Sequence, residues 1–372
     1  MKKLFYFLCV ILMFSCNVHK EDMNWRVKSD KNIQLLDLNI DTIRMDEVCS
    51  SYVGEVLFRD DSICFIDKRF CWIFTFDKEG KFGKRYLGKG SGPSEINTGL
   101  IDGLAKLSNG GFFFVGPCND CHLFSEKLER EASFSIDNGN RNKKNINLSD
   151  FAIYTKMYPK LIFREYNGYL YSNQYCEHPE FDYIANKSYY KDAKLLSRMN
   201  IKNGKVDNIY ANYPKMYSEK ILNQFNLFSF DIDKKGNSYF CFEADSLIYK
   251  YDSNFNPLYS FGYKGTKMNT SYKCLDSFSK LKKDRDIERE EKSYYDWIKY
   301  IDEVDLLFRS YKKENSNSFD GMQIYRGSTL IGDVNVPKGF RVSGYIEPYI
   351  YSNVKIYEED EKMEIYRFNI SK

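Results

Sequence analysis

The sequence predicts an all-β protein, a six-bladed β-propeller, with a seven-bladed ring as the alternative. Two segments repeat at a spacing of 175 residues: Trp72 to Phe76 aligns with Leu247 to Tyr251, and Lys89-Gly90 falls on Lys264-Gly265 without a gap. A third copy, Ile365 to Phe368, lies near the carboxyl end. The chain has 31 tyrosines and 29 phenylalanines, residues that favour strands. Repeats of ~40–50 residues with four strands each are typical of propeller blades.

Each copy is an alternating apolar strand, and in the first two copies a turn led by Asp77 or Asp252 follows it. The segment 31–45 would supply the missing strand of the last blade, which closes the ring and removes an exposed sheet edge. Residues 31–372 would then form one propeller domain, with a charged insertion, helical or irregular, near 277–297. We expect the six blades near residues 50–90, 97–136, 146–212, 216–266, 288–335 and 338–372.

The amino terminus has the features of an export signal. Lys2 and Lys3 precede an apolar run of 11 residues, Leu4 to Phe14. This run is shorter than the ~20 residues that span a bilayer and suits a secretory signal. Ser15 directly before Cys16 resembles the lipobox of bacterial lipoproteins, in which the cysteine receives the lipid. We expect a signal peptide at 1–15, lipid attachment at Cys16 and a polar tether at 16–30; the alternative is an ordinary signal peptide with a chance cysteine.

These features predict a soluble body in the cell envelope, anchored by lipid to the outer membrane, with a periplasmic or surface orientation left open. The mean hydropathy is -0.55, and the formal net charge is +3. Subtracting Lys2 and Lys3 leaves +1, which gives no case for nucleic acid, because that partner needs a basic patch. We expect a monomeric propeller whose partners are the membrane and a glycan or an envelope protein.

A glycine-rich segment after the first repeat copy is either a phosphate-binding loop or a structural corner. Gly88, Gly90, Gly92, Pro93 and Glu95 give the spacing G-x-G-x-G-P. A dinucleotide loop needs G-x-G-x-x-G between a strand and a helix, and a mononucleotide loop needs Gly-Lys-Ser/Thr at the start of a helix. Strand and turn signals surround this segment instead. Because glycine tolerates positive φ, we interpret it as a corner where the chain crosses between blades.

The stretch Phe76 to Glu95 resembles the first-blade signature of six-bladed β-propeller lipoproteins of gut anaerobic bacteria, a largely uncharacterised family. The lipobox, the segment Tyr294 to Arg309 and the carboxyl-terminal strand that ends at Ile370 are similar to that group as well. The resemblance implies a propeller anchored in the cell envelope. It implies no activity, because propellers host many functions.

Cys118, Cys121 and His122 form the C-x-x-C-H pattern of covalent haem attachment,. The pattern lies between two predicted strands of one blade, whereas a haem module would need helices and a distal ligand. We therefore expect no haem and no other cofactor, and a local disulfide or free thiols stay open. A single C-x-x-C is weak support for zinc, and no G-x-S-x-G elbow is present. The sequence identifies no catalytic residue and no metal ligand.

Two classes of function remain. The first, which we favour, is a non-catalytic binding or scaffold lipoprotein; the second is a channel-centred hydrolase or lyase, metal-dependent or not. The irregular stretch Gln174 to Tyr190 carries five aromatic rings, and such rings supply contact surface for glycans and proteins. The alternative is that these rings pack onto the flank of the blade. We expect a ligand-contact loop that consists of Tyr175, Phe181, Tyr183, Tyr189 and Tyr190.

Overall fold

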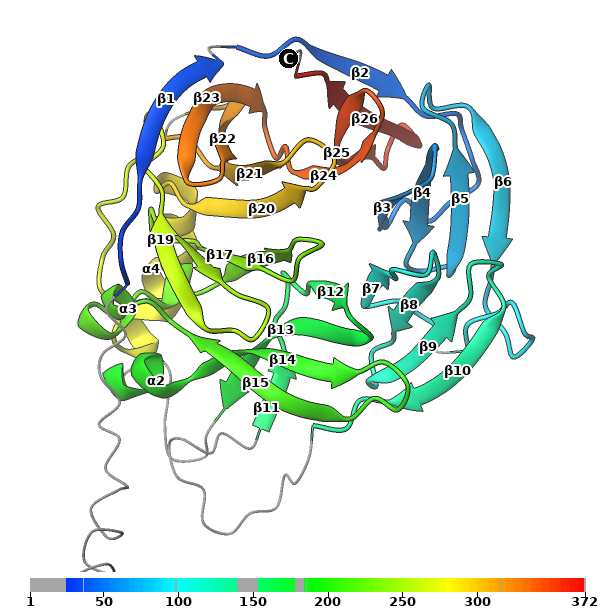
Figure 1. The fold of residues 1–372 in the computed structure, drawn as a ribbon, viewed down its shortest axis with the longest axis horizontal. Helices are drawn as coiled ribbons and strands as arrows, with labels where there is room; N and C mark the ends of the chain where they lie inside the picture. The colour runs from blue at the N-terminus through cyan, green and yellow to red at the C-terminus, as the bar shows by residue number, and fades with distance from the viewer. Residues whose placement is uncertain are drawn as a thin grey trace, which may run out of the picture.

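The computed structural model describes residues 25–370, apart from 36, 98, 139–152, 178–183, 185 and 315. Six sheets surround a common centre as the blades of a propeller (Figure 1). We number the blades one to six in chain order, starting at Gly54. The predicted six-bladed β-propeller is therefore confirmed, and the seven-bladed alternative is wrong. Cys16, the expected lipid-attachment residue, lies outside the described residues.

Blades one, two and four are antiparallel sheets of four strands, in which each strand pairs with the next along the chain. Alternating apolar side chains face the neighbouring blades; Phe113 of blade two, for example, contacts Phe163 of blade three with ring centroids 5.4 Å apart. The strands are β3 (Gly54–Arg59), β4 (Ser62–Asp67), β5 (Trp72–Phe76) and β6 (Phe82–Leu87) in blade one, β7 (Gly103–Lys106), β8 (Phe112–Val115), β9 (Asp120–Phe124) and β10 (Arg130–Ser135) in blade two, and β16 (Phe228–Ile232), β17 (Ser238–Phe242), β18 (Ile248–Tyr251) and β19 (Pro257–Phe261) in blade four.

Blade three has an extra strand because its second strand is long. The first half of β13 pairs with β12, and its second half extends past β12 to pair with β11. The strands are β11 (Ile153–Lys156), β12 (Phe163–Tyr166), β13 (Tyr169–Glu177), β14 (Lys194–Asn200) and β15 (Val206–Asn212).

The amino-terminal segment joins both of the last two blades. β1 (Asp30–Leu35) pairs in parallel with the outermost strand of blade five, and β2 (Ile40–Arg44) pairs antiparallel with the last strand of blade six. The predicted closure of the ring is therefore present, and β1 adds a fifth strand to blade five. The other strands are β20 (Tyr295–Ile301), β21 (Leu306–Tyr311), β22 (Phe319–Arg326) and β23 (Thr329–Pro337) in blade five, and β24 (Val342–Ile346), β25 (Tyr349–Tyr357) and β26 (Lys362–Phe368) in blade six.

Four short helical segments gather beside blades three to five, at the left of Figure 1. They are α2 (Lys187–Asp192), α3 (Lys215–Glu219), the 3-10 helix η1 (Asn223–Phe225) and α4 (Phe278–Glu291). α4 occupies most of the charged segment near 277–297, and Ser277 caps it by accepting a hydrogen bond from the backbone N–H of Lys280 at 3.4 Å. Within the described part of the chain, no helix combines the length and the apolarity needed to cross a membrane.

The first strand of each blade lies nearest the centre of the ring: β3, β7, β12, β16, β20 and β24 (Figure 1). Because every blade repeats the same path, all six strands begin at one face, which we call the N-terminal face. Residues just before these strands share that face with the loops between second and third strands. Side chains far apart in the sequence can therefore meet there.

Candidate binding site at the channel mouth

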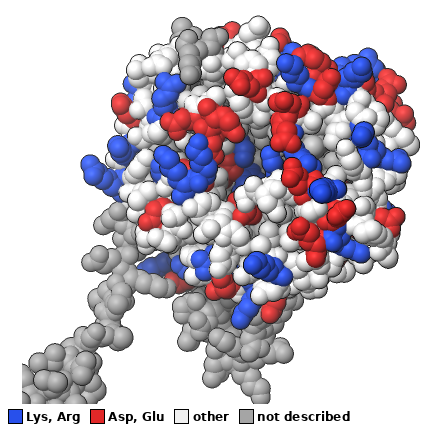
Figure 2. Space-filling view, turned by 45° about the vertical axis from the view of Figure 1, so that its right-hand side comes forward, with Lys and Arg blue, Asp and Glu red and all other residues white. Residues whose placement is uncertain are grey.

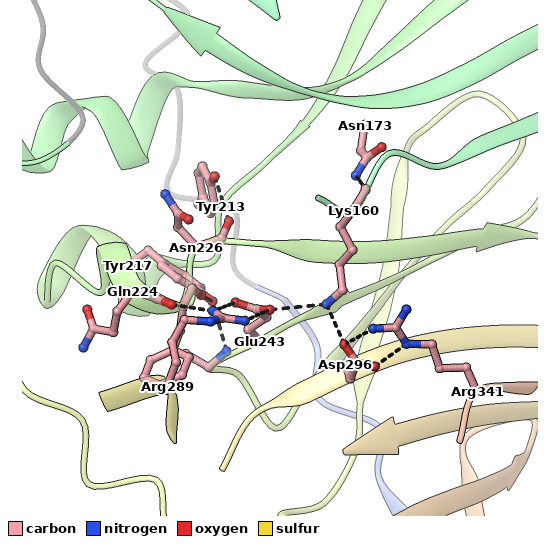
Figure 3. Close-up of polar contacts among 12 residues, drawn as sticks. Lys160, Asn173, Tyr213, Tyr217, Gln224, Asn226, Glu243, Arg289, Asp296 and Arg341 are labelled. Carbon is pink, nitrogen blue, oxygen red and sulfur yellow. Dashed lines mark hydrogen bonds and ion pairs between the residues drawn. The ribbon is translucent and has the colours of Figure 1, made fainter. Parts of the chain in front are cut away.

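A network of buried and partly exposed charges lies at the N-terminal face where blades three to six meet (Figure 3). Lys160 precedes β12, and its Nζ contacts a carboxylate oxygen of Glu243 at 3.3 Å and one of Asp296 at 3.3 Å. Asn173 of β13 holds the segment, because its Oδ1 accepts from the N–H of Ile162 at 2.7 Å and its Nδ2 donates to the carbonyl of Lys160. Two carboxylates thus balance one buried ammonium.

Each of these carboxylates has a second cationic partner. Arg289 of α4 donates to both oxygens of Glu243, at 2.8 and 3.1 Å. Arg341, directly before β24, donates twice to Asp296, once at 3.0 Å. Burial alone would raise the pKa of Asp296, but Lys160 and Arg341 outweigh burial and lower this pKa to about 2. Asp296 is therefore ionised at neutral pH.

A second charge cluster involves the innermost strands of blades three to five. Asp231 of β16 accepts from Nε of Arg164 on β12, and its Oδ2 lies 3.1 Å from Nζ of Lys299 on β20. The backbone N–H of Tyr300 also donates to Asp231, at 2.8 Å. Burial alone would raise the pKa of Asp231, but Lys299 and Arg164 outweigh burial and lower it. The two cations therefore hold this fully buried carboxylate in its charged form.

Trp297 of β20 lies between the two clusters. Its ring centroid is 5.7 Å from the guanidinium of Arg164 and 5.7 Å from that of Arg341. The indole N–H donates to the carbonyl of Val342 at 2.8 Å, which fixes the ring. Trp297 is half-buried, and the Arg341 side chain keeps 40% of its surface exposed. An aromatic ring with two guanidinium groups near it is thus open to solvent in part.

The two clusters carry more positive than negative groups. Five cations face three carboxylates, an excess of two positive charges that attracts anionic ligands. Figure 2 shows basic and acidic side chains together around a hollow in the surface. The cations are Lys160, Arg164, Arg289, Lys299 and Arg341, and the carboxylates are Asp231, Glu243 and Asp296.

The predicted aromatic loop is not part of this site. Tyr175 lies half-buried in β13, and Tyr189 and Tyr190 fold into α2 with 2% and 0% of their surface exposed. The Tyr190 ring packs against Tyr213 and Tyr217 at 5.0 and 5.9 Å. The expectation that Tyr189 and Tyr190 offer a contact surface is therefore wrong, because a helix and a tyrosine cluster bury both rings. Phe181 and Tyr183 lie outside the described residues.

The glycine segment connects β6 to β7 and folds back on its own glutamate. The Glu95 carboxylate accepts from the N–H of Gly92 at 2.7 Å, and a Cβ at Gly90 would lie 2.1 Å from that carboxylate. The carbonyl of Pro93 accepts from the N–H of Arg130 at 2.8 Å, which ties the segment to blade two. The carbonyl of Gly88 closes the turn by accepting a hydrogen bond from the backbone N–H of Ile96 at 2.8 Å. This geometry supports a structural corner, because an internal carboxylate occupies the place of an external anion.

The C-x-x-C-H residues lie at the start of β9. Cys118 is exposed, Cys121 is buried, and all eight cysteines of the described ranges are free. His122 is buried, and its Nδ1 lies 2.9 Å from Oγ of Ser133. Successive residues of a strand point to opposite faces, so the Cys121 thiol and the His122 ring diverge. In the described ranges, no three His, Cys, Asp or Glu residues form a group that could hold a metal. The absence of haem stays a prediction.

We call the two charge clusters together with Trp297 the channel mouth. Sequence reasoning did not find its charged residues. Lys160, Glu243, Asp296 and Arg341 are scattered over four blades and share no local motif. One signal was present: Lys160, Asp296 and Arg341 all lie at or just before the first strand of a blade, the position that faces the centre. To recognise this shared position from the sequence, the repeats would have to be aligned with one another to an accuracy of one residue.

The fold and the charged centre define the class of this protein: a six-bladed β-propeller with a positively biased channel mouth. Among solved structures, the chain is similar to a member of the DUF4221 family from Bacteroides vulgatus, with a TM-score of 0.66, 14% identity, and coverage of 92% of this chain and 99% of that chain. It is also similar to a putative exported protein from Bacteroides fragilis, with a TM-score of 0.52, 12% identity, and coverage of 93% and 100%.

At these identities the two likenesses show the fold alone. Both neighbours are Bacteroides propellers, which fits the resemblance to propellers of gut bacteria. No family model matches the chain, and no curated protein matches it.

Proposed function

We propose that this protein is a lipid-anchored lipoprotein of the cell envelope whose propeller binds an acidic glycan. The observation that carries the proposal is Trp297 with the guanidinium groups of Arg164 and Arg341 each 5.7 Å from its ring centroid, in a site with an excess of cations. An acidic sugar offers an apolar ring face that packs on an indole. Its carboxylate pairs with a guanidinium by charge-assisted hydrogen bonds, the stronger kind. One acidic sugar therefore offers a partner to the indole of Trp297 and a partner to a guanidinium group.

The state of the carboxylates favours binding over chemistry. A general acid or base works best when its pKa lies near the operating pH. Asp296 is held at a pKa of about 2, because Lys160 and Arg341 outweigh the opposing effect of burial. Glu243 is engaged by Lys160 and by both nitrogens of Arg289. The carboxylates of Asp296 and Glu243 therefore orient the cations. The channel-centred hydrolase or lyase remains the alternative, and the titration described below can detect it.

The proposed anchor would hold the propeller close to the membrane. Trp25 packs edge-on against Tyr249 and Tyr251 of blade four, at 4.9 and 5.0 Å between centroids. A fully extended chain spans at most ~3.5 Å per residue, so the segment from Cys16 to Trp25 reaches about 30 Å. The outer edge of blade four would then be the membrane-proximal side. The centre of the ring would stay open to soluble ligands.

Binding is tested by calorimetric titration of the purified propeller with a galacturonate oligomer and with an uncharged oligomer of equal length. The wild type should bind the acidic oligomer, and Arg341→Gln should weaken binding at least tenfold through loss of a charge-assisted pair. Arg326→Gln, at an exposed position at the end of β22, is the matched control and should bind normally. Equal affinity for both oligomers would refute the proposal, and shortened products would establish the enzymatic alternative.

Anchoring is tested by fractionation of cells that express the full chain. Cys16→Ala should move the protein from the membrane to the soluble fraction, because the lipid then has no attachment site. Wild-type protein should remain with the membrane under the same conditions. If the variant still partitions wholly with the membrane, the lipoprotein part of the proposal fails, whatever the outcome of the titration.

A further inference from the structure

A cavity is lined by residues of blades two and three, and none of the charged residues of the two clusters described above lines it. Its volume is about 330 Å³, at the lower end of the ~300–1,000 Å³ typical of ligand pockets. One part of the lining is apolar, with Leu161, Phe163 and Met199. The other part consists, apart from Lys156, mainly of neutral hydrogen-bonding side chains, among them Ser172, Gln174 and Ser197. Such a mixture suits a ligand with apolar faces and many hydroxyl groups.

Gln174 is the polar group that points to a ligand. It lines the cavity on β13 with only 5% of its surface exposed. Its Nε2 has no hydrogen-bond partner in the described part of the chain. Buried amide groups are nearly always paired, and each exception needs an explanation such as water or a ligand. An acceptor oxygen of a bound molecule would satisfy this donor.

The charge of the cavity indicates a neutral ligand. Among the described residues that line it, Lys156 alone carries a charge. Its ammonium is already occupied, because Asp102 accepts from it at 3.0 Å and the carbonyls of Gly116 and Pro117 accept at 2.6 and 3.2 Å. Asp102 also neutralises that charge and accepts from the hydroxyl of Tyr158. No unbalanced charge is left among these lining residues to select an ion.

We propose that this cavity is a second binding site that takes a neutral sugar, with Gln174 donating to a hydroxyl or ring oxygen and Leu161, Phe163 and Met199 packing on the apolar face of the ring. The ligand is either a free monosaccharide or the terminal residue of a longer glycan. The charged residues of the acidic-glycan site do not line this cavity, nor does Trp297, although Asn173, which holds the Lys160 segment, is one of its lining residues.

The test is saturation-transfer NMR and calorimetry of the full propeller with glucose, galactose, mannose and N-acetylglucosamine, and with disaccharides that end in the sugar that binds best. Wild type should bind at least one monosaccharide saturably. Gln174→Met and Gln174→Glu should each weaken that binding at least tenfold, since both lose the donor. Gln34→Met, exposed on β1, is the matched control and should bind normally. Thermal melting checks that every variant is folded.

Arg341→Gln separates this site from the channel mouth and should leave neutral-sugar binding unchanged. Tighter binding of a disaccharide than of the monosaccharide would identify a glycan terminus as the natural ligand, and equal binding would identify a free sugar. Absence of saturable binding to the whole panel, unchanged binding in the folded Gln174 variants, or loss of binding in Arg341→Gln would each overturn the proposal and leave a water-filled cavity.

Discussion

Asp296 links the two halves of the charge network at the channel mouth. It lies 3.3 Å from the ammonium of Lys160 and is paired twice with Arg341, so it joins blades three, five and six through side chains. Its carboxylate must be ionised to do so. Among the described residues, protonation of this one group would leave the buried Lys160 with Glu243 as its only carboxylate partner.

The first prediction concerns the pH dependence of this contribution. Although burial opposes ionisation, Lys160 and Arg341 lower the pKa of Asp296 to about 2, below its ordinary value of 3.8. A lowered pKa contributes stability that is complete above about pH 5 and is lost progressively as the pH falls through 2. Asp296→Asn should therefore reduce the free energy of unfolding by about 2 kcal/mol at pH 7. The gap to wild type should narrow at pH 3.

Urea unfolding at pH 7, 5 and 3 measures this gap. Asp286→Asn, at an exposed position on α4, is the control and should change little at any pH. A gap for Asp296→Asn of the same size at pH 7 and at pH 3 would show that the carboxylate has an ordinary pKa and that the ion pairs do not stabilise its charge.

Single residues also show what local sequence can and cannot predict. Asp77 and Asp252 were matched by their sequence surroundings, and both lead the same turn: Oδ1 of Asp77 accepts from residues 79 and 81 at 2.9 Å, and Oδ1 of Asp252 accepts from residues 254 and 256 at 2.9 and 2.8 Å. Because such a turn is formed by five consecutive residues, it can be predicted from the local sequence alone. The contacts of Lys160 depend on residues 83 and 136 positions away and have no local cause.

At the scale of elements, β1 and β2 are neighbours in the chain but join different blades. β2 completes blade six, and its Ile43 is 9% exposed in a cluster with Met363 and Ile365 of β26. β1 lies on the outside of blade five, where Ile33 keeps 36% of its surface exposed. Closure of the ring therefore depends on β2, whereas β1 covers the outer edge of β23 in blade five.

These two isoleucines make a matched pair of variants. Ile43→Ala should lower the free energy of unfolding by about 2–4 kcal/mol, because it leaves a cavity where the ring closes. Ile33→Ala, the same chemical change on an exposed strand, should cost less than about 0.5 kcal/mol. Chemical denaturation followed by circular dichroism measures both. Equal losses in the two variants would contradict the assignment of closure to β2.

The short helix α2 explains why the sequence does not reveal that Tyr189 and Tyr190 are buried. Six residues are fewer than two turns, too few for a 3.6-residue apolar period to be visible in the sequence. The helix begins because Asn186 accepts a hydrogen bond from the N–H of Ser188 at 2.9 Å. Tyr213 packs against both of its tyrosines and Tyr217 packs against Tyr190, and these partners follow more than 20 residues later. Only the packed structure brings these rings together.

At the scale of the whole molecule, the repeats predicted the ring, and the ring creates the site. Alternating apolar strands, aspartate turns and the closing segment are visible in the sequence because each recurs. Lys160, Glu243, Asp296 and Arg341 come from four blades and meet only when the blades surround one centre. Their convergence is a property of the closed ring.

Fluorescence of Trp297 tests most directly whether a ligand binds at that centre. The chain has three tryptophans, so Trp25→Phe combined with Trp72→Phe leaves Trp297 as the single reporter. Addition of a galacturonate oligomer should change its emission saturably, and the change should disappear in the same protein with Arg341→Gln but persist with Arg326→Gln. An emission that stays constant while calorimetry shows binding would place the acidic ligand elsewhere and contradict the assignment of the channel mouth as the binding site.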